Sequence, residues 1–190
     1  IERKNMLYRS SEGLIFERGC VIVASSFKSN DIEIKKILEN IENGSNQLPD
    51  FQRGWVLDDN RIKSLIASIS NSYPVGALMF LEYGGDNVRF KYRPFQGSAA
   101  TVRPDVLVLD GQQRLTSVFG AMYCRDAVKT QTEKHKDIQR FYYLDIKQCL
   151  NISTDRVDAI ISMPKDKTLR SDFGRNIDLD LSTTENEYKG

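Results

Sequence analysis

The chain concentrates its polar chemistry in one short segment, residues 110–114, which reads DGQQR and lies between two apolar stretches. Arg114 offers a planar fork of donors that suits phosphate, and Gly111 lets the backbone approach a ligand closely. Gln112 and Gln113 can each donate and accept hydrogen bonds. Asp110 is the one group of this DGQQR motif that could hold Mg²⁺ or accept a proton. These residue types favour an anion site beside a single carboxylate.

The DGQQR motif stands where the pattern predicts a strand followed by a helix. The apolar run 106–109 has β-branched residues and leads into Asp-Gly, which favours a buried strand. The first N–H groups of a helix lack intrahelical acceptors and lie at the positive end of its dipole, so such a turn can bind an anion. The helix itself is predicted by apolar residues at i, i+3, i+4 and i+7, namely Leu115, Val118, Phe119 and Met122.

A purely structural role for the motif stays open at this point. Asp-Gly is a common turn, Asp is a good N-cap, and an arginine in a first helical turn is usually a solvated surface residue. Thr116, inside the first turn, can hydrogen-bond a phosphate or its own backbone, and we expect the backbone contact.

A second segment, residues 51–53, has similar chemistry. It reads FQR and places Gln52 and Arg53 beside a turn and ahead of a helix. If the two loops meet in space, their amides and arginines surround one anion, and Arg53 and Arg114 form a two-loop phosphate clamp. The test of this clamp is whether the two guanidinium groups face each other. Taken alone, Phe51 is typical of a core contact and Arg53 of an ion-pair partner.

Length and composition bound the class of protein. The chain has 190 residues, 28% of them charged, and a net charge of +1, which is typical of one globular domain and excludes a generally basic nucleic-acid-binding surface. The basic clusters 89–93 and 129–136 are typical of solvated faces. The three cysteines have no metal spacing, and His135 is the only histidine, so a Ser-His-Asp nucleophile and a multi-histidine metal site are disfavoured. Catalysis would therefore depend on carboxylates, arginines and amides.

The cellular setting is predicted from the same composition. No stretch is long and apolar enough for a membrane span or a signal peptide, so we expect a cytoplasmic protein without a membrane partner. The odd number of scattered cysteines fits a reducing compartment. Because the chain begins at Ile1 and ends in a polar segment, we expect it to be part of a longer protein.

Two further helices are predicted by apolar stripes. Each has a capping residue before it and a stop after it. The first has Asn30 or Asp31 as its cap and Gly44 as its stop, and its stripe is Ile34, Ile37, Leu38 and Ile41. The second has Asp58 or Asp59 as its cap and Tyr73-Pro74 as its stop, and its stripe is Ile62, Leu65, Ile66 and Ile69.

The strands are predicted with less regularity. Residues 75–83 and 88–92 flank a Gly-Gly-Asp-Asn turn and predict a hairpin, followed by a mobile or lid-like loop over 94–104. Further strands are expected at 19–24 and 140–146, residues 157–163 fit a helix or a strand, and the chain from residue 164 reads as weakly structured. Helices and strands mix without strict alternation, which predicts an α+β fold.

The two motifs together resemble the N-terminal domain of GmrSD-type modification-dependent restriction proteins. The segments LPDFQRGWVLDDNRIKSLIASISNSYPVGALMFL and VLVLDGQQRLTSV carry the resemblance, which covers about residues 30–125; a downstream stretch, 161–182, is also similar. Trp55 stands where the family usually has Tyr or Phe, and Leu57 where it often has Trp. The matching positions are Pro49, Phe51, Gln52, Arg53, Leu65, Ser68, Ile69, Tyr73, Pro74, Gly76, Asp110, Gly111, Gln112, Gln113, Arg114, Leu115 and Thr116.

The resemblance implies a ParB/sulfiredoxin-like core with a small mixed sheet flanked by helices. On this basis residues 1–30 are an N-terminal extension, 31–127 are the ParB-like domain with the DGQQR motif, and 128–190 are the C-terminal part of the same domain, truncated at its end. The resemblance also implies a role in defence against foreign DNA, including phage DNA. An HNH nuclease domain, absent from this sequence, would lie on the missing part or on a separate chain.

The leading hypothesis is a nucleotide-binding and NTP-hydrolysing domain, a phosphoric anhydride hydrolase or a part of a restriction endonuclease, that uses GTP or ATP with Mg²⁺. Asp110 would hold the metal. A nuclease would need further metal-binding carboxylates, for which Asp50, Asp58 and Asp59 are uncertain candidates. The alternatives are a non-catalytic module that senses modified DNA or a nucleotide, and a ParB-like nuclease. The catalytic candidates are Asp110, Gln112 and Arg114, and the phosphate-binding candidates are Gln52, Arg53, Gly111, Gln113, Arg114 and Thr116.

Overall fold

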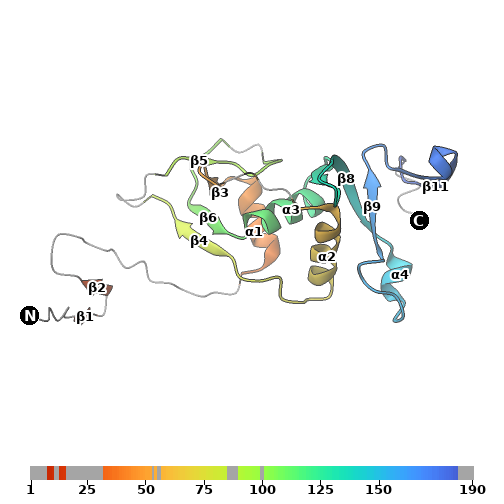
Figure 1. Ribbon diagram of the computed structural model, residues 1–190. Coiled ribbons are helices and arrows are strands. Elements are labelled where there is room, and N and C mark those ends of the chain that lie inside the picture. Colours follow the sequence, from red (N-terminus) through yellow and green to blue (C-terminus); the bar gives the residue numbers. More distant parts are fainter. Residues whose placement is uncertain are drawn as a thin grey trace, which may run out of the picture. The chain divides into compact units, whose positions relative to one another are not determined.

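The computed structural model describes residues 8–10, 13–15, 32–52, 54, 57–84, 90–98 and 101–183 (Figure 1). The chain divides into two units, residues 1–33 and 34–190. In the first unit, β1 (Tyr8–Ser10) pairs with β2 (Gly13–Ile15) in an antiparallel arrangement. The strand predicted at 19–24 and the cap predicted at Asn30 or Asp31 lie outside the described residues.

The second unit contains a small mixed sheet in the strand order β4-β6-β3-β5. The β3–β6 pair is parallel, whereas β4–β6 and β3–β5 are antiparallel. The mixed sheet and its accompanying helices give the α+β class that the sequence predicts. The strands are β3 (Asn46–Pro49), β4 (Met79–Glu82), β5 (Tyr92–Arg93) and β6 (Val106–Asp110), and the helices are α1 (Ile34–Glu42), α2 (Asp59–Ser70) and α3 (Gln112–Met122).

The predicted apolar stripes largely become the first hydrophobic core. In α1 the stripe is buried from Ile37 to Ile41, and Gly44 ends the helix in a left-handed conformation with φ of 83°. In α3 the stripe is buried as far as Phe119, but Met122 is 51% exposed because the helix ends there. Helix α2 starts at the predicted cap, since the Asp58 carboxylate accepts a hydrogen bond of 2.9 Å from the Arg61 N–H.

The predicted hairpin of residues 75–83 and 88–92 is wrong in its pairing. Strand β4 pairs with β6 and strand β5 pairs with β3, so the two lie at opposite edges of the sheet. The neighbours Leu107 and Val108 are both fully buried, and successive side chains of a strand point to opposite faces. Strand β6 is therefore covered on both faces and takes an inner position between β4 and β3. Of the expected turn, residues 84–87, only Gly84 lies within the described residues.

The loop predicted to be lid-like is held to the core at its start. Phe95 is 1% exposed and belongs to the first core, and the Ser98 hydroxyl donates a hydrogen bond of 3.0 Å to the Ile41 carbonyl at the end of α1. These contacts fix residues 95–98 against α1, contrary to the expected lid; residues 99–100 lie outside the described part.

A second sheet follows, formed by β7 (Val128–Gln131), β8 (Asp137–Leu144) and β9 (Ile160–Pro164), all antiparallel. Residues 157–163, open between helix and strand in the sequence, thus enter a strand from Ile160. The short helix α4 (Ile146–Leu150) lies between β8 and β9 in the chain. A second hydrophobic core joins α2 to this sheet through Ile62, Ile66, Ala67 and Ile160.

The polar C-terminal segment is more regular than predicted. Strands β10 (Thr168–Ser171) and β11 (Asn176–Asp180) form a hairpin around the short helical turn Asp172–Gly174. The expectation of weak structure from residue 164 onward is wrong, because backbone pairing across a tight turn needs few apolar side chains. In the part of the chain that the structure describes, no helix has the length and apolar character needed to cross a membrane.

Candidate functional site

The predicted strand–turn–helix arrangement of the DGQQR motif is present. Gly111 lies between β6 and α3 in a left-handed conformation, with φ of 85° and ψ of 9°, and its carbonyl accepts the first helical hydrogen bond from Leu115 at 3.0 Å. A Cβ at Gly111 would lie 2.3 Å from Leu78 Cδ2, so both conformation and space require glycine here. Gly111 has no side chain to cap α3, which leaves the positive end of the helix for a ligand.

The two predicted loops meet at Gln52. Its side-chain amide donates a hydrogen bond of 2.7 Å to the Leu109 carbonyl, one residue before Asp110. The Arg93 guanidinium in turn donates to the Gln52 carbonyl at 3.1 Å. The Gln52 side-chain oxygen is buried and accepts no hydrogen bond from the described residues. Arg53, the second half of the predicted phosphate clamp, lies outside the described residues.

The Arg114 guanidinium is engaged by protein groups. It donates hydrogen bonds to the Val75 carbonyl at 2.5 Å and the Ala77 carbonyl at 2.8 Å, and its Nη2 lies 3.7 Å from the Asp110 carboxylate. Between these carbonyls, Gly76 has φ of +93°, and a Cβ there would lie 2.3 Å from Arg114 Nη1. Arg114 therefore ties loop 73–78 to the beginning of α3. This contact is structural, and phosphate binding by Arg114 stays a prediction.

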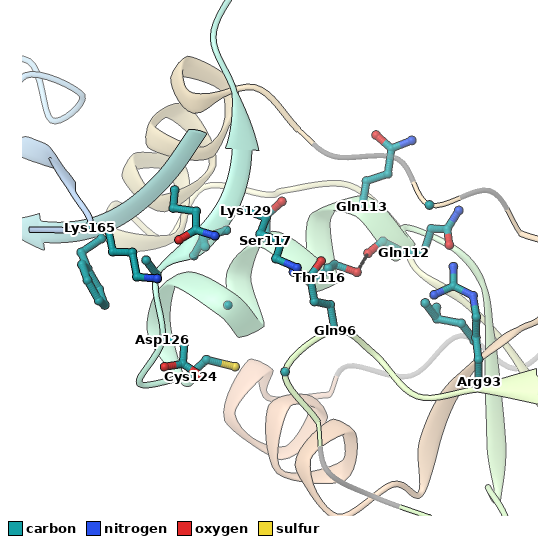
Figure 2. Close-up of a pocket in the computed structure, with 18 of the residues that line it drawn as sticks. Arg93, Gln96, Gln112, Gln113, Thr116, Ser117, Cys124, Asp126, Lys129 and Lys165 are labelled. Atoms are coloured by element: carbon teal, nitrogen blue, oxygen red, sulfur yellow. Dashed lines mark hydrogen bonds between the residues drawn. The ribbon is translucent and has the colours of Figure 1, made fainter. Parts of the chain in front are cut away.

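A cavity of about 780 Å³ lies along α3 (Figure 2), and no residue of loop 73–78 is among its described lining residues. One side of the helix lines it with Gln112, Gln113, Thr116, Ser117 and Gly120, whose spacing is that of a single helix face. The structure thus separates the predicted site residues into two groups. Gln112, Gln113 and Thr116 line the cavity, whereas Asp110, Gly111, Arg114 and Gln52 are not among its described lining residues.

The described part of the cavity wall has an excess of positive charge. Its charged residues are four cations, Arg93, Lys129, Lys165 and Lys167, and one carboxylate, Asp126. Such a hollow attracts anions, because its walls concentrate the field of one sign of charge. No sequence pattern predicts this group, because its members come from separate segments. Arg93 and Lys129 belong to clusters that were interpreted as solvated faces. The amides Gln96 and Gln139 and the ring of Phe141 also line the cavity.

Thr116 makes the expected backbone contact. Its hydroxyl donates a hydrogen bond of 2.7 Å to the Gln112 carbonyl one turn earlier, shown as a dashed line in Figure 2. Because the hydroxyl proton is used in this bond, only the oxygen lone pairs of Thr116 face other partners. A phosphate, which needs donors, would gain little from Thr116 in this conformation.

The carboxylates considered for a metal are dispersed. Asp58 caps α2, and Asp59 accepts hydrogen bonds from the Tyr142 and Ser162 hydroxyls at 2.8 and 2.7 Å. Within the described ranges, no group of three or more His, Cys, Asp or Glu side chains could hold a metal ion. Asp110 remains as a single carboxylate with a 70% exposed side chain. One carboxylate fits Mg²⁺ that arrives with substrate phosphates, and does not fit an all-protein metal site.

The comparisons with known proteins agree with the two motifs. Residues 34–189 match the family described as GmrSD restriction endonuclease, N-terminal domain. An uncharacterized protein of Methanocaldococcus jannaschii is 31% identical over 140 residues, which cover 70% of this chain and 22% of that protein. The chain therefore spans about a fifth of the length of this relative. No solved structure matches, so the ParB/sulfiredoxin-like assignment stays a prediction. The family match extends over most of the chain and includes both the FQR and the DGQQR segments, and the chain belongs to the family of GmrSD restriction endonuclease N-terminal domains.

Proposed function

We propose that this domain binds a nucleoside triphosphate in the cavity beside α3 and hydrolyses it, as part of a prokaryotic protein that restricts modified foreign DNA. The observation that carries the proposal is the charge of the described cavity lining, four cations and one carboxylate, next to a helix whose N-cap residue Gly111 makes no side-chain cap hydrogen bond. Its volume of about 780 Å³ lies within the range of small-molecule sites.

The residues of the cavity divide the work of phosphoryl transfer. The first N–H groups of α3 and the Arg93 guanidinium receive the terminal phosphate. Gln112 and Gln113 line the same end and orient the attacking water. The water oxygen forms a bond to the terminal phosphorus while the bond from that phosphorus to the bridging oxygen breaks. The bridging oxygen keeps the electron pair and stays on the nucleoside diphosphate, and both water protons leave on the released dihydrogen phosphate. Mg²⁺, when bound, would neutralise phosphate charge beside Asp110.

Arg114 acts in this proposal as a positioning residue. Its hydrogen bonds to Val75 and Ala77 fix the start of α3, whose N–H groups face the ligand. Gln52 acts similarly on Leu109, at the end of β6. If the ligand extends from the cavity to the DGQQR turn itself, its phosphates would also be contacted directly by the other predicted residues. These residues are Gln52, Arg53, Gly111 and Arg114.

The experiment is phosphate release from GTP and ATP by the full chain with Mg²⁺, compared between the native protein and Asp110→Asn. We expect Asp110→Asn to lower turnover by about a hundredfold or more, with an unchanged circular dichroism spectrum. Asp50→Asn is the matched control, because Asp50 is an exposed carboxylate on the other loop. Equal turnover of the native and Asp110→Asn proteins would remove Asp110 from the mechanism.

The same samples separate the other candidate functions. Nucleotide binding without phosphate release would make the domain a sensing module. A mobility shift with modified DNA that weakens steeply with salt would add DNA recognition, and plasmid nicking by this chain alone would indicate a nuclease. We expect DNA cleavage to require an HNH nuclease domain outside this chain.

A further inference from the structure

The described lining of the cavity contains one carboxylate, that of Asp126. Asp126 lies in the turn between α3 and β7. In Figure 2, Asp126 and Lys165 lie at one end of the cavity, and Arg93 and Gln112 lie at the other. A carboxylate repels phosphate, so Asp126 suits a part of the ligand other than its phosphates.

The charge of Asp126 is not neutralised within the described ranges, where no ion pair engages its carboxylate. Its effect is seen at the neighbouring thiol of Cys124. Burial raises the pKa of this thiol, and the charge of Asp126 raises it further. Asp126 is also exposed, so a ligand can reach it. A charged acceptor of this kind suits a ligand that presents N–H donors.

Two ammonium groups of the second sheet line the same cavity. Lys129 belongs to β7 and is separated from Asp126 by two residues of chain, and Lys165 directly follows β9. Among the described residues, no ion pair engages either lysine. Gln139 stands directly opposite Lys129 in the β7–β8 register and also lines the cavity. The lining away from the beginning of α3 thus combines one strong acceptor with strong donors.

Small and apolar residues line the cavity where α3 meets the second sheet. They are Gly120, Ala127 and Val128, and the ring of Phe141 in β8 adds an aromatic surface. A Cβ at Gly120 would lie 3.2 Å from Val128 Cγ2, so α3 packs closely against β7 at this point. Such a surface suits a flat aromatic ring, whose faces are apolar and whose edge carries the polar groups.

These donors and acceptors match the edges of guanine. Guanine presents two neighbouring donors, N1–H and the 2-amino group, which together suit a carboxylate. It also presents two acceptors, O6 and N7, which suit lysine. Adenine has an acceptor at N1, which a carboxylate repels. The lining therefore distinguishes between the two purines.

We infer that the cavity selects guanine nucleotides, with the Asp126 carboxylate accepting hydrogen bonds from N1–H and the 2-amino group of the base, and with Lys129 and Lys165 donating to O6 and N7. The inference rests on the proposed nucleotide binding and adds the identity of the base. Along α3 the lining runs from Gln112 to Gly120, about 12 Å of helix. The ribose and the phosphate chain span this length, and only the terminal phosphate lies at the beginning of α3.

The test measures, by calorimetry with Mg²⁺, the binding of the β,γ-imido analogues of GTP, ATP and xanthosine triphosphate, which resist hydrolysis. The full chain is compared in its native form, as Asp126→Asn, and as the control Asp158→Asn, which removes the same charge from an exposed carboxylate outside the described lining.

We expect the native protein to bind the GTP analogue about tenfold more tightly than the ATP analogue, or better. Asp126→Asn should lower this ratio about tenfold. The same variant should bind the xanthosine analogue about tenfold more tightly relative to the ATP analogue, because the new amide can donate to the C2 carbonyl of xanthine. The control should leave every ratio within about twofold of the native value. A purely structural role of Asp126 would not produce the gain for xanthine.

Equal affinities of the native protein for the GTP and ATP analogues, or the same ratio in the native and Asp126→Asn proteins, would overturn the inference and leave the proposed function standing. Phosphate release from GTP is measured on the same samples. If the native protein selects the GTP analogue but releases no phosphate, base selection stands and the proposed hydrolysis fails. If the native protein binds none of the three analogues, both are refuted.

Discussion

The side-chain amide of Gln52 donates a hydrogen bond of 2.7 Å to the carbonyl oxygen of Leu109. The bond fills a gap in the sheet. The β4–β6 register shifts beside Leu109, which has no Cα partner in β4, and the β3–β6 pairing stops at Leu107. Gln52 thus replaces a missing strand at the end of β6 and joins the two motifs of the chain.

Replacing Gln52 should loosen the DGQQR turn. Gln52→Ala leaves the Leu109 carbonyl without its donor, and we expect the free energy of unfolding to fall by about 1–2 kcal/mol in urea denaturation. Gln52→Glu should be at least as harmful, because a carboxylate cannot donate and repels the carbonyl oxygen. Gln113→Ala, an amide in the first turn of α3, is the control and should change stability by less than about 0.5 kcal/mol. Equal effects at Gln52 and Gln113 would contradict a specific role for the Gln52 bond.

Gly76 and Arg114 should behave as a coupled pair. Gly76→Ala forces an unfavourable φ and pushes Arg114 away from the Val75 and Ala77 carbonyls. We expect Gly76→Ala to lower the free energy of unfolding by about 3 kcal/mol or more in the native background. In an Arg114→Ala background the clash is gone, and the same substitution should cost only about 1 kcal/mol.

Gly174→Ala is the matched control for this cycle. Gly174 has φ of +89° but open space around its Cβ position, so it reports the effect of φ alone. We expect Gly174→Ala to lower the free energy of unfolding by the same amount as Gly76→Ala does in the Arg114→Ala background. Simple additivity of Gly76→Ala and Arg114→Ala would show that the two residues are independent.

Cys124 should report occupancy of the cavity. Burial, with the charges of Asp126 and Glu42, raises the pKa of its thiol, so alkylation at neutral pH should be slow and should accelerate as the pH rises. Because Cys124 lines the cavity, we expect GTP or ATP to protect it further. Peptide-resolved mass spectrometry measures this directly, with Cys149 of α4 as the internal control outside the lining residues. Equal protection of both cysteines would argue against a ligand in the cavity.

Tyr142 should make stability depend on pH in the alkaline range. Burial first, and then the charge of Asp59 and the hydrogen bond to it, raise the pKa of the Tyr142 phenol in the folded state. In the unfolded chain the pKa is about 10. The folded state therefore holds this proton more tightly, so the stabilising contribution is complete below pH of about 10 and falls as the pH rises above it.

Urea denaturation across this pH range, with Tyr142→Phe, tests the assignment. We expect Tyr142→Phe to lower the free energy of unfolding by about 1–2 kcal/mol at pH 8. The difference in this free energy between the native and Tyr142→Phe proteins should become smaller above pH of about 10. Tyr73→Phe, at an exposed tyrosine, should leave the pH profile of the native protein unchanged. A constant difference between native and Tyr142→Phe proteins would show that another group titrates.

The sequence predicted the features that depend on local pattern. The stripe of α1, the Asp58 cap and the β6–α3 turn all follow from residues a few positions apart, and each is present. The predicted strand pairing was wrong, because the pairing of β4 with β6 depends on the burial of Leu107 and Val108 by elements distant in the chain.

The candidate site was predicted only in part, for the same reason. Gln112 and Gln113 were found because the motif is continuous, whereas Lys129, Phe141 and Lys165 meet only after β7, β8 and β9 have paired. No local pattern marks such a cluster. Arg114 was expected at phosphate because its guanidinium suits anions, yet the same donors also suit the carbonyls of Val75 and Ala77.

Helix α2 belongs to both hydrophobic cores. Leu65 and Ile69 pack against the first core, whereas Ile62 and Ile66 belong to the second, on the side of β9. Unpacking of either sheet would expose the apolar side chains on one side of α2 to water. We therefore expect α2 to unfold when either sheet unfolds. The two halves of the larger unit should therefore unfold in a single cooperative transition. A destabilising substitution in the second sheet should lower the fraction of molecules in which the DGQQR turn is folded.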